Sequence, residues 1–476
     1  MNKLALSLSA ALLLGGCSTL QSLNPFDSNS NKDIRERQGE VEGERIAILA
    51  LDDQLNAGGS IAPGALPLPE GYVNQDWPQA GGNAGHAMGR TLADATLERA
   101  WRESAGDGSD RKGRVVAPPV IAEGRIYVMD SDNTVRAVDE QTGDTVFRVE
   151  VEKEAIGKTR TAGTSIEDRI KNPFGLFGGG GGSDKESVGG GVAVGDGKLY
   201  VSSGLGIMAA YDANTGAALW QTPTRTPLHS APTYADGRVF ATSDDNEIFA
   251  FNANTGEVIW TYQGIIEPAR MLTASAPAVA GEVVIAPFSS GEVVALRVQN
   301  GGVVWQDALS SPGRLTPLSS INDIAAGPVV ADGFVIASAQ SGNTTAFDLR
   351  TGGRVWSQPA GMIGFPLVVG DNVFGVTTNA EVVAMSKLDG SVTWLTQLEA
   401  FGKPKKRKDR IAWIGPVLAG NQLVVANSEG RMITVDVQSG TITGEQKVGD
   451  SVFVPPVIAN QTVYLLTDGA KLVAYR

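Results

Sequence analysis

The chain has 476 residues, and its 52 Asp and Glu residues outnumber its 39 Lys and Arg residues, which gives a net charge of −13 at pH 7. A net charge of this sign disfavours a general binder of nucleic acid or of anionic surfaces. The chain has one cysteine, Cys17, and therefore cannot form an intrachain disulfide. Its 59 glycines and 23 prolines are typical of an all-β chain that is rich in turns.

The first seventeen residues have the pattern of a bacterial lipoprotein signal. Lys3 precedes an apolar run over residues 4–14, which is too short to span a bilayer. The Leu-Gly-Gly-Cys sequence that ends at Cys17 resembles a lipobox, in which the cysteine is lipidated and becomes the first mature residue. An ordinary secretory signal is the alternative, but the one cysteine stands where a lipobox requires it. We expect residues 1–16 to be a signal peptide and Cys17 to carry acyl chains that anchor the protein stably.

Residues 17–71 have the composition of a tether between this anchor and a folded domain at 72–476. By resemblance to the sorting rules of enteric bacteria, Ser18 after the cysteine favours the outer membrane, at its periplasmic face. An apolar run at 46–51 fits either a short helix or a strand that docks on the domain. Three prolines between positions 63 and 69 indicate an extended linker.

One hairpin recurs along the rest of the chain. Its clearest copy, Ala210–Trp220, has the pattern Ala-x-Asp-x-x-Thr-Gly-x-x-x-Trp, in which Asp and Thr bond the turn backbone and Gly takes a positive φ. Close copies end at Trp260 and Trp356. Weaker copies span residues 137–147, 295–305, 384–394 and 434–444. Seven copies at a near-constant period predict a repeat architecture.

Each hairpin belongs to a four-stranded meander. A strand that begins with a small residue and Pro, such as Ala231-Pro232, precedes a turn such as Asp236-Gly237 and a strand of β-formers at 238–242. Four short strands at this period predict the blades of an all-β propeller.

The two ends of the repeat region predict an eighth blade. Residues 455–475 supply three strands, and the chain then stops where a tryptophan strand should follow. A strand at residues 97–101, which ends at Trp101, has no turn before it and supplies the missing partner. We therefore predict an eight-bladed β-propeller, with four antiparallel strands per blade and the last blade closed by this N-terminal strand.

Two segments interrupt the repeat. Residues 151–188 contain a glycine run without the Lys-Ser/Thr pair of a phosphate loop, so a surface loop is the better interpretation. Residues 403–410 hold six cations, which fit an anionic lipid, an acidic partner or, as the favoured interpretation, a solvated loop.

The hairpin is similar to the tryptophan-docking motif of propellers related to quinoprotein alcohol dehydrogenases. Residues 76–82 resemble the lead-in of those propellers, which packs against the ring. Eight such blades behind a lipobox resemble the BamB family, lipoproteins of the outer-membrane β-barrel assembly (BAM) machinery. This resemblance covers about residues 72–476 and implies a non-catalytic scaffold that binds the periplasmic domains of BamA, and other BAM components indirectly, as a monomer within a hetero-complex. The docking residues it implies are Trp101, Trp220, Trp260, Trp305, Trp356 and Trp394.

The resemblance also implies two partner-binding loops. In the family, the loop before blade four carries two leucines and then an arginine. Their places fall on Ala269, Met271 and Leu272, with Arg270 the nearest guanidinium. In the loop before blade five, Asp323 matches the first of two acidic residues. An arginine with exposed apolar neighbours suits an interface, whereas capping of inner strands by Met271 and Leu272 is the alternative.

A quinone-dependent periplasmic dehydrogenase is the alternative function for this propeller. Such enzymes typically have a vicinal cysteine pair beside the quinone and carboxylates that bind calcium, and Cys17 alone cannot supply that pair. His86 and His229 lack ligand spacing for zinc, and most acidic residues fit turn positions. We therefore expect no catalytic residue, cofactor or metal. A generic ligand-binding propeller of the periplasm stays open as a third hypothesis.

Overall fold

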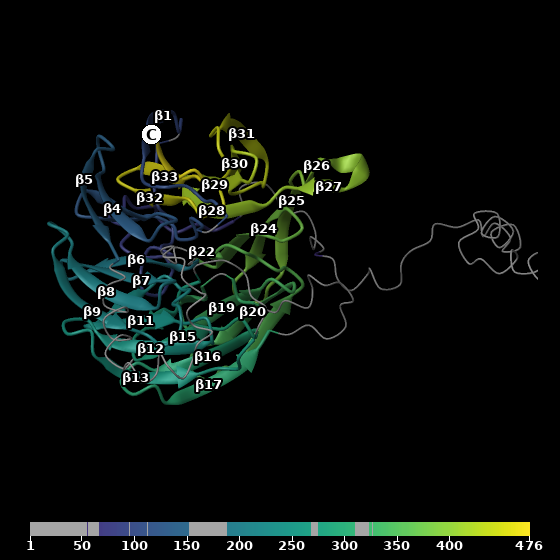
Figure 1. The fold of residues 1–476 in the computed structure, drawn as a ribbon. Coiled ribbons are helices and arrows are strands. Elements are labelled where there is room, and N and C mark those ends of the chain that lie inside the picture. The colour runs from purple at the N-terminus through teal and green to yellow at the C-terminus, as the bar shows by residue number, and fades with distance from the viewer. Residues whose placement is uncertain are drawn as a thin grey trace, which may run out of the picture. The chain divides into compact units, whose positions relative to one another are not determined.

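A computed structural model describes residues 55, 66–94, 96–111, 113–151, 188–267, 275–309, 323–325 and 327–476 (Figure 1). Residues 55–476 form one compact unit. The predicted signal peptide, Cys17 and nearly all of the predicted tether before residue 66 lie outside the described residues. No helix in the described part of the chain is long and apolar enough to cross a membrane.

The described chain forms eight four-stranded antiparallel sheets, which confirms the predicted eight-bladed β-propeller (Figure 1). The blades, inner strand first, are blade 1, β2 (Val120–Ala122), β3 (Arg125–Met129), β4 (Thr134–Asp139) and β5 (Thr145–Glu150); blade 2, β6 (Gly190–Gly195), β7 (Lys198–Ser203), β8 (Ile207–Asp212) and β9 (Ala218–Pro223); blade 3, β10 (Thr233–Ala235), β11 (Arg238–Thr242), β12 (Glu247–Asn252) and β13 (Val258–Gln263); blade 4, β14 (Ala278–Ala280), β15 (Val283–Pro287), β16 (Glu292–Arg297) and β17 (Val303–Ala308); blade 5, β18 (Val329–Ala331), β19 (Phe334–Ala339), β20 (Asn343–Asp348) and β21 (Arg354–Gln358); blade 6, β22 (Leu367–Val369), β23 (Asn372–Val376), β24 (Glu381–Ser386) and β25 (Val392–Gln397); blade 7, β28 (Trp413–Ala419), β29 (Gln422–Asn427), β30 (Arg431–Asp436) and β31 (Ile442–Lys447); and blade 8, β32 (Val457–Ala459), β33 (Thr462–Leu466), β34 (Lys471–Tyr475) and β1 (Arg99–Ser104).

Burial changes from the inside to the outside of each blade. In blade 3 the middle strands β11 and β12 are buried along their central residues, whereas the outer strand β13 keeps only Trp260 buried and exposes most of its other side chains. Middle strands are covered on both faces by the neighbouring blades, so nearly continuous runs of β-formers suit them. The inner strands of consecutive blades contact one another and line the centre of the ring.

Blade 8 is built from both ends of the described chain. Strand β1 pairs with β34, with Arg102 opposite Val473, and the backbone N–H of Arg476 donates to the carbonyl oxygen of Glu98 at 2.8 Å. The predicted position of this strand was two residues too early, because Leu97 has a φ of 47° and a buried side chain. A residue with positive φ breaks the extended backbone, so the strand begins at Arg99.

Tryptophans join successive blades. In five junctions the indole N–H donates to a backbone carbonyl of the next blade at 2.7–3.2 Å: Trp220 to Ala253, Trp260 to Val298, Trp305 to Leu349, Trp356 to Lys387, and Trp394 to Val437. The same rings lie on the turn glycines of the next blade, at positions 256, 301, 352, 390 and 440, all with positive φ. Trp101 lies on Gly143 of blade 1 without a hydrogen bond from its indole N–H within the described structure. Five of the six predicted docking tryptophans therefore share one geometry, with an indole hydrogen bond to the next blade and a ring on its turn glycine.

The junction between blades 7 and 8 differs from the others. Gly444 occupies the tryptophan position of β31, opposite Thr434, and blade 8 has chain ends where other blades have a turn. The side-chain amide of Gln446 donates instead to the carbonyl oxygen of Leu97 at 3.0 Å. The N-terminal segment thus makes this junction with a polar contact in place of an indole.

Residues 72–92 cross the centre of the ring. Their main chain bonds to inner strands of four blades, at Ile121, Val194, Val279 and Val330. These contacts agree with the expectation that the lead-in at 76–82 packs against the ring. The segment also accepts hydrogen bonds from Gly420 and Asn460, in the turns that follow inner strands β28 and β32. It therefore lies at the face where the inner strands end, which we call the turn face.

Candidate partner-binding face

The opposite face of the ring carries the long connections of the chain. Because every blade is the same meander, each link from an outer strand to the next inner strand begins and ends where the inner strands begin. We call this side the loop face. The links after β5, β13, β17 and β25 are the longest, and they contain the predicted insertion 151–188, both predicted partner loops and the predicted basic segment 403–410. The described ends of these four links, far apart in sequence, therefore lie on one side of the propeller.

The first predicted partner loop connects β13 to β14. Ala269, Arg270, Met271 and Leu272 lie outside the described residues, so their role stays a prediction. The described part of this link places two apolar side chains at the surface, because Ile265 is 62% exposed and Ile266 is 64% exposed. Such a pair at the entrance of a link is a surface feature that binding would desolvate.

The main chain beneath this isoleucine pair is fixed by blades 3 and 4. The carbonyl oxygen of Ile265 accepts a hydrogen bond of 2.6 Å from the side-chain amide of Asn246, and its N–H donates to Glu292 at 2.8 Å. The N–H of Gly264 donates to the carbonyl oxygen of Asn246 at 2.8 Å. Sequence reasoning missed this pair, although two adjacent isoleucines after a Gln-Gly turn were a visible signal.

The second predicted partner loop ends at Asp323. This residue is only 6% exposed, and its carbonyl oxygen accepts a hydrogen bond of 3.0 Å from the N–H of Gln340. The next residue, Ile324, packs against Trp305 and Leu309 in the core between blades 4 and 5. Asp323 thus anchors the end of the loop on the ring, and a contact with a partner stays a prediction.

The basic segment is exposed to solvent, as expected, but it forms a hairpin and not an irregular loop. Strand β26 (Phe401–Lys403) pairs with β27 (Lys408–Arg410), and the 3₁₀ turn η4 (Pro404–Lys406) joins them. Figure 1 shows this hairpin projecting away from the blades. Within it Lys403 pairs with Asp409 at 2.7 Å, and the Arg407 guanidinium lies 5.7 Å from the centre of the Phe401 ring.

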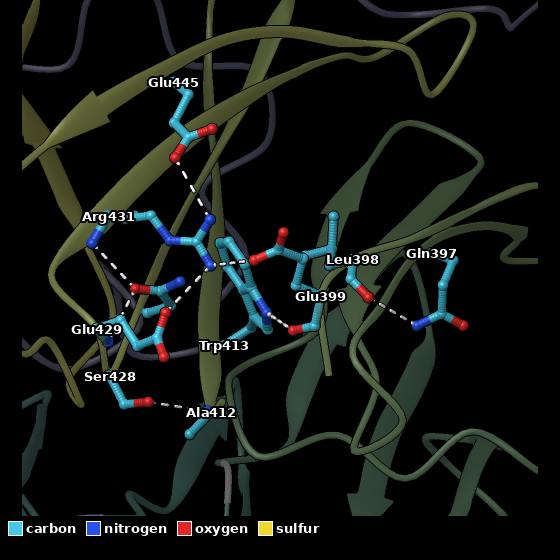
Figure 2. Close-up of polar contacts among 10 residues, drawn as sticks. Gln397, Leu398, Glu399, Ala412, Trp413, Ser428, Glu429, Arg431 and Glu445 are labelled. Carbon is cyan, nitrogen blue, oxygen red and sulfur yellow. Dashed lines mark hydrogen bonds and ion pairs between the residues drawn. The ribbon is translucent and has the colours of Figure 1, made fainter. Parts of the chain in front are cut away.

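The root of this hairpin is held by blade 7 (Figure 2). The Arg431 guanidinium pairs with Glu399 at 2.6 Å, with Glu429 at 3.3 Å and with Glu445 at 3.4 Å. It also lies 5.7 Å from the ring centre of Trp413. An arginine offers several donors in one plane, so a single side chain can hold three carboxylates around the root.

The centre of the ring is lined by apolar and proline side chains around a small hollow. Trp77, His86, Met88 and Phe365 line it together with prolines that lie in or just before the inner strands of blades 1, 6, 7 and 8. The His86 Nδ1–H donates to the carbonyl oxygen of Pro328 at 2.6 Å, and burial lowers the pKa of His86 to about 4. This histidine is therefore a neutral packing residue at pH 7.

The other histidine also belongs to the framework. His229 is buried between blades 2 and 3, 3.7 Å from a carboxylate oxygen of Asp244 and 3.4 Å from the Thr242 hydroxyl. The described ranges contain no group of three or more His, Cys, Asp or Glu residues arranged to hold a metal ion.

Sequence comparison with known proteins shows which family this chain belongs to. The sequence matches the family described as "Outer membrane protein assembly factor BamB" over residues 94–182 and 178–396. It is 31% identical to the protein of that name from Shigella dysenteriae over 378 residues, which cover 79% of this chain and 86% of the relative. The chain belongs to the BamB family. A second BamB, from Escherichia coli K12, is 30% identical over 378 residues, again 79% of this chain and 86% of the relative.

Solved structures of other proteins share the fold of this chain. The crystal structure of BamB from Moraxella catarrhalis superposes with a TM-score of 0.62 at 17% identity, covering 80% of this chain and 99% of that one. A europium-containing methanol dehydrogenase gives a TM-score of 0.58 at 14% identity, covering 82% and 89%. At these identities the likeness shows the shared propeller, so membership in the BamB family rests on the sequence.

Proposed function

We propose that this chain is a non-catalytic scaffold of the outer-membrane β-barrel assembly complex. A lipid on Cys17 holds the ring at the periplasmic face of the outer membrane. The loop face binds the periplasmic domains of BamA and presents them to incoming outer-membrane proteins. Family membership supports the assembly role, because the relatives are named outer membrane protein assembly factors.

One observation carries the choice of binding surface. Both predicted partner loops leave the same face of the ring, and the first begins beside an exposed isoleucine pair whose backbone is already fixed at Ile265. A preformed apolar patch loses little conformational entropy on binding, which favours association. Arg270 and Leu272 follow Ile266 by four and six positions and supply the polar and apolar parts of an interface anchor.

The dehydrogenase alternative is supported by the similarity of this fold to solved dehydrogenase structures. The methanol dehydrogenase and quinohemoprotein alcohol dehydrogenase neighbours are 14% and 16% identical to this chain. In this propeller Trp77, His86 and Met88 of the lead-in line the hollow at the centre of the ring. No described residue group favours that alternative over the scaffold.

The test is photo-crosslinking of the membrane-anchored protein in cells. A benzophenone amino acid replaces Ile266, Arg270 or Leu272 on the loop face, and Asp196 on the turn face serves as the control. We expect the three loop-face positions to crosslink a barrel protein with periplasmic repeat domains, and the Asp196 position to give no such product. Equal crosslinking at Asp196, or no barrel partner at any position, would reject the assignment of the loop face.

A charged variant tests the isoleucine pair without a probe. Ile265→Asp/Ile266→Asp should reduce recovery of the barrel protein in a mild-detergent pull-down on the order of tenfold, since each aspartate would have to be desolvated. Leu388→Asp is the matched control, because Leu388 is 54% exposed and lies in a turn at the turn face. Equal recovery by the double variant and wild type would show that the pair lies outside the interface.

A further inference from the structure

We propose that the β26–β27 hairpin, residues 401–410, is a second membrane contact that binds the surface of a bilayer containing anionic phospholipid. The contact is electrostatic and lies outside the proposed partner loops. It takes only the membrane location from the proposed function.

The hairpin reverses the charge of the protein locally. It contains four lysines, two arginines and one aspartate, which leave it at +5, whereas the rest of the chain carries −18. An anionic bilayer would repel most of the ring and attract this segment, so the charge distribution orients the molecule as well as binding it. The net negative charge of the chain is therefore compatible with binding to an anionic membrane through this one hairpin.

The cations of the hairpin are displayed rather than used in folding. The side chains of Lys405, Lys406 and Lys408 are exposed and form no ion pair or hydrogen bond with any residue that the structure describes. Lys403 pairs with Asp409, and Arg410 donates to the carbonyl oxygen of Thr378 in blade 6. The inner cations thus hold the hairpin in shape, and the lysines at its tip are left available to a ligand.

The hairpin lies in the sector of the ring where the tether arrives. Leu66, the first residue of the continuously described chain, exchanges two hydrogen bonds with Gln438 and packs in one core cluster with Leu398, Ile411 and Trp413. That cluster fills the interface between blades 6 and 7, from which the hairpin projects (Figure 1). Gln438 lies in the β30–β31 turn on the turn face, whereas the hairpin leaves the loop face, so the tether and the basic tip share this sector of the ring from opposite faces.

The side-chain chemistry favours lipid over an acidic protein. Specific ion pairs at protein interfaces use the planar fork of arginine, whereas a lysine is a hydrated point charge on a flexible stem. At this tip lysines predominate, and one of the two arginines already bonds the ring. Diffuse lysine charge suits a surface of many phosphodiester groups, where clustered basic residues add to the binding of a lipid anchor.

The experiment measures binding of the full chain to vesicles without the anchor. Cys17→Ala prevents acylation, and the protein is mixed with vesicles of phosphatidylethanolamine alone or with one part in four of phosphatidylglycerol. We expect flotation with the anionic vesicles at about 50 mM salt and loss of binding at about 500 mM. Lys405→Glu/Lys406→Glu/Lys408→Glu should weaken partition on the order of tenfold or more.

The control reverses exposed cations elsewhere. Arg350→Glu/Lys447→Glu changes a turn at the turn face and an outer strand, and it should bind the anionic vesicles nearly as wild type does. Unchanged urea midpoints would show that all variants are folded. The proposal would be overturned if the hairpin variant bound the anionic vesicles as well as wild type does, or if the control variant lost as much binding as the hairpin variant. Wild-type binding to neutral vesicles as strong as its binding to anionic vesicles would also overturn it. Absent vesicle binding together with a crosslink from Lys405 to an acidic protein would assign the hairpin to that protein instead. Because the vesicle assay contains no barrel protein, its result is independent of the crosslinking test of the loop face.

Discussion

The indole N–H of Trp413 donates a hydrogen bond of 2.8 Å to the carbonyl oxygen of Glu399, so the two ends of the basic hairpin are tied together at its root. Arg431 covers this tie from β30, two strands away in the same blade, and pairs with the Glu399 carboxylate. Glu399 is therefore held by two residues of blade 7 that lie 14 and 32 positions further along the chain, so the order of the hairpin depends on that blade.

Loss of the arginine should loosen the hairpin without unfolding the ring. Arg431→Gln leaves Glu399, Glu429 and Glu445 close together without a cation, and like charges repel. We expect trypsin to cut the native protein within residues 403–410 about tenfold faster, because cleavage follows the free energy of local opening. Arg350→Gln is the control, and equal cleavage rates would show that the root does not depend on Arg431.

The turn glycines beneath the docking rings should tolerate no side chain. An added Cβ at Gly352 would lie 2.6 Å from the Trp305 ring, whereas at Gly333 it would meet nothing within 4 Å, although both residues have positive φ. Gly333→Ala should cost about 1–2 kcal/mol for its backbone alone. Gly352→Ala should cost about 1–3 kcal/mol more in urea unfolding, and equal costs would mean that the ring moves aside freely.

The indole hydrogen bonds should contribute measurably to the junctions. Trp260→Phe removes the donor to Val298 and part of a mostly buried ring, so we expect a loss of about 1–3 kcal/mol in the free energy of unfolding. Val258→Ala, at an exposed position of the same strand, should stay within about 0.5 kcal/mol of wild type. A Trp260→Phe variant as stable as wild type would contradict a role for the bond.

Buried His86 should make the propeller acid-sensitive. Burial lowers its pKa from 6.5 to about 4, so the unfolded chain takes up a proton that the folded chain refuses between these values. The stability is complete above pH 6.5 and falls as the pH drops toward 4. At pH 5 the loss should be about 2 kcal/mol relative to pH 8. His86→Gln should lack this component, and identical pH profiles would contradict the assignment.

The repeat made most of the fold predictable from the sequence. The hairpin pattern ending at Trp220 locates strands and turns because each of its residues has a local role in the turn or the strand. Trp101 identified the closing strand because its strand had no hairpin partner next to it in the sequence. The start of β1 was misplaced because the positive φ of Leu97 depends on its burial in the ring. Local patterns do not record such tertiary constraints.

The candidate sites were less predictable for the same reason. The cation run at 403–410 resembles a solvated loop until Trp413 and Arg431 are seen to hold its root. His86 looks polar in sequence, yet the lead-in carries it into the centre of the ring. Arg270 and its neighbours lie outside the described residues, and their role stays a prediction.

The pairing of β1 with β34 has a consequence for synthesis and export. The two strands are separated by nearly the whole length of the propeller, so the ring can shut only after residues 471–475 have arrived. Until then blade 8 is incomplete and the strands at both ends have unpaired backbone groups, which invite pairing with other chains. Long-range closure of this kind is slow relative to local hairpin formation. A chain interrupted before β34 should therefore fail as a whole, with seven nearly complete blades unable to compensate for one missing strand.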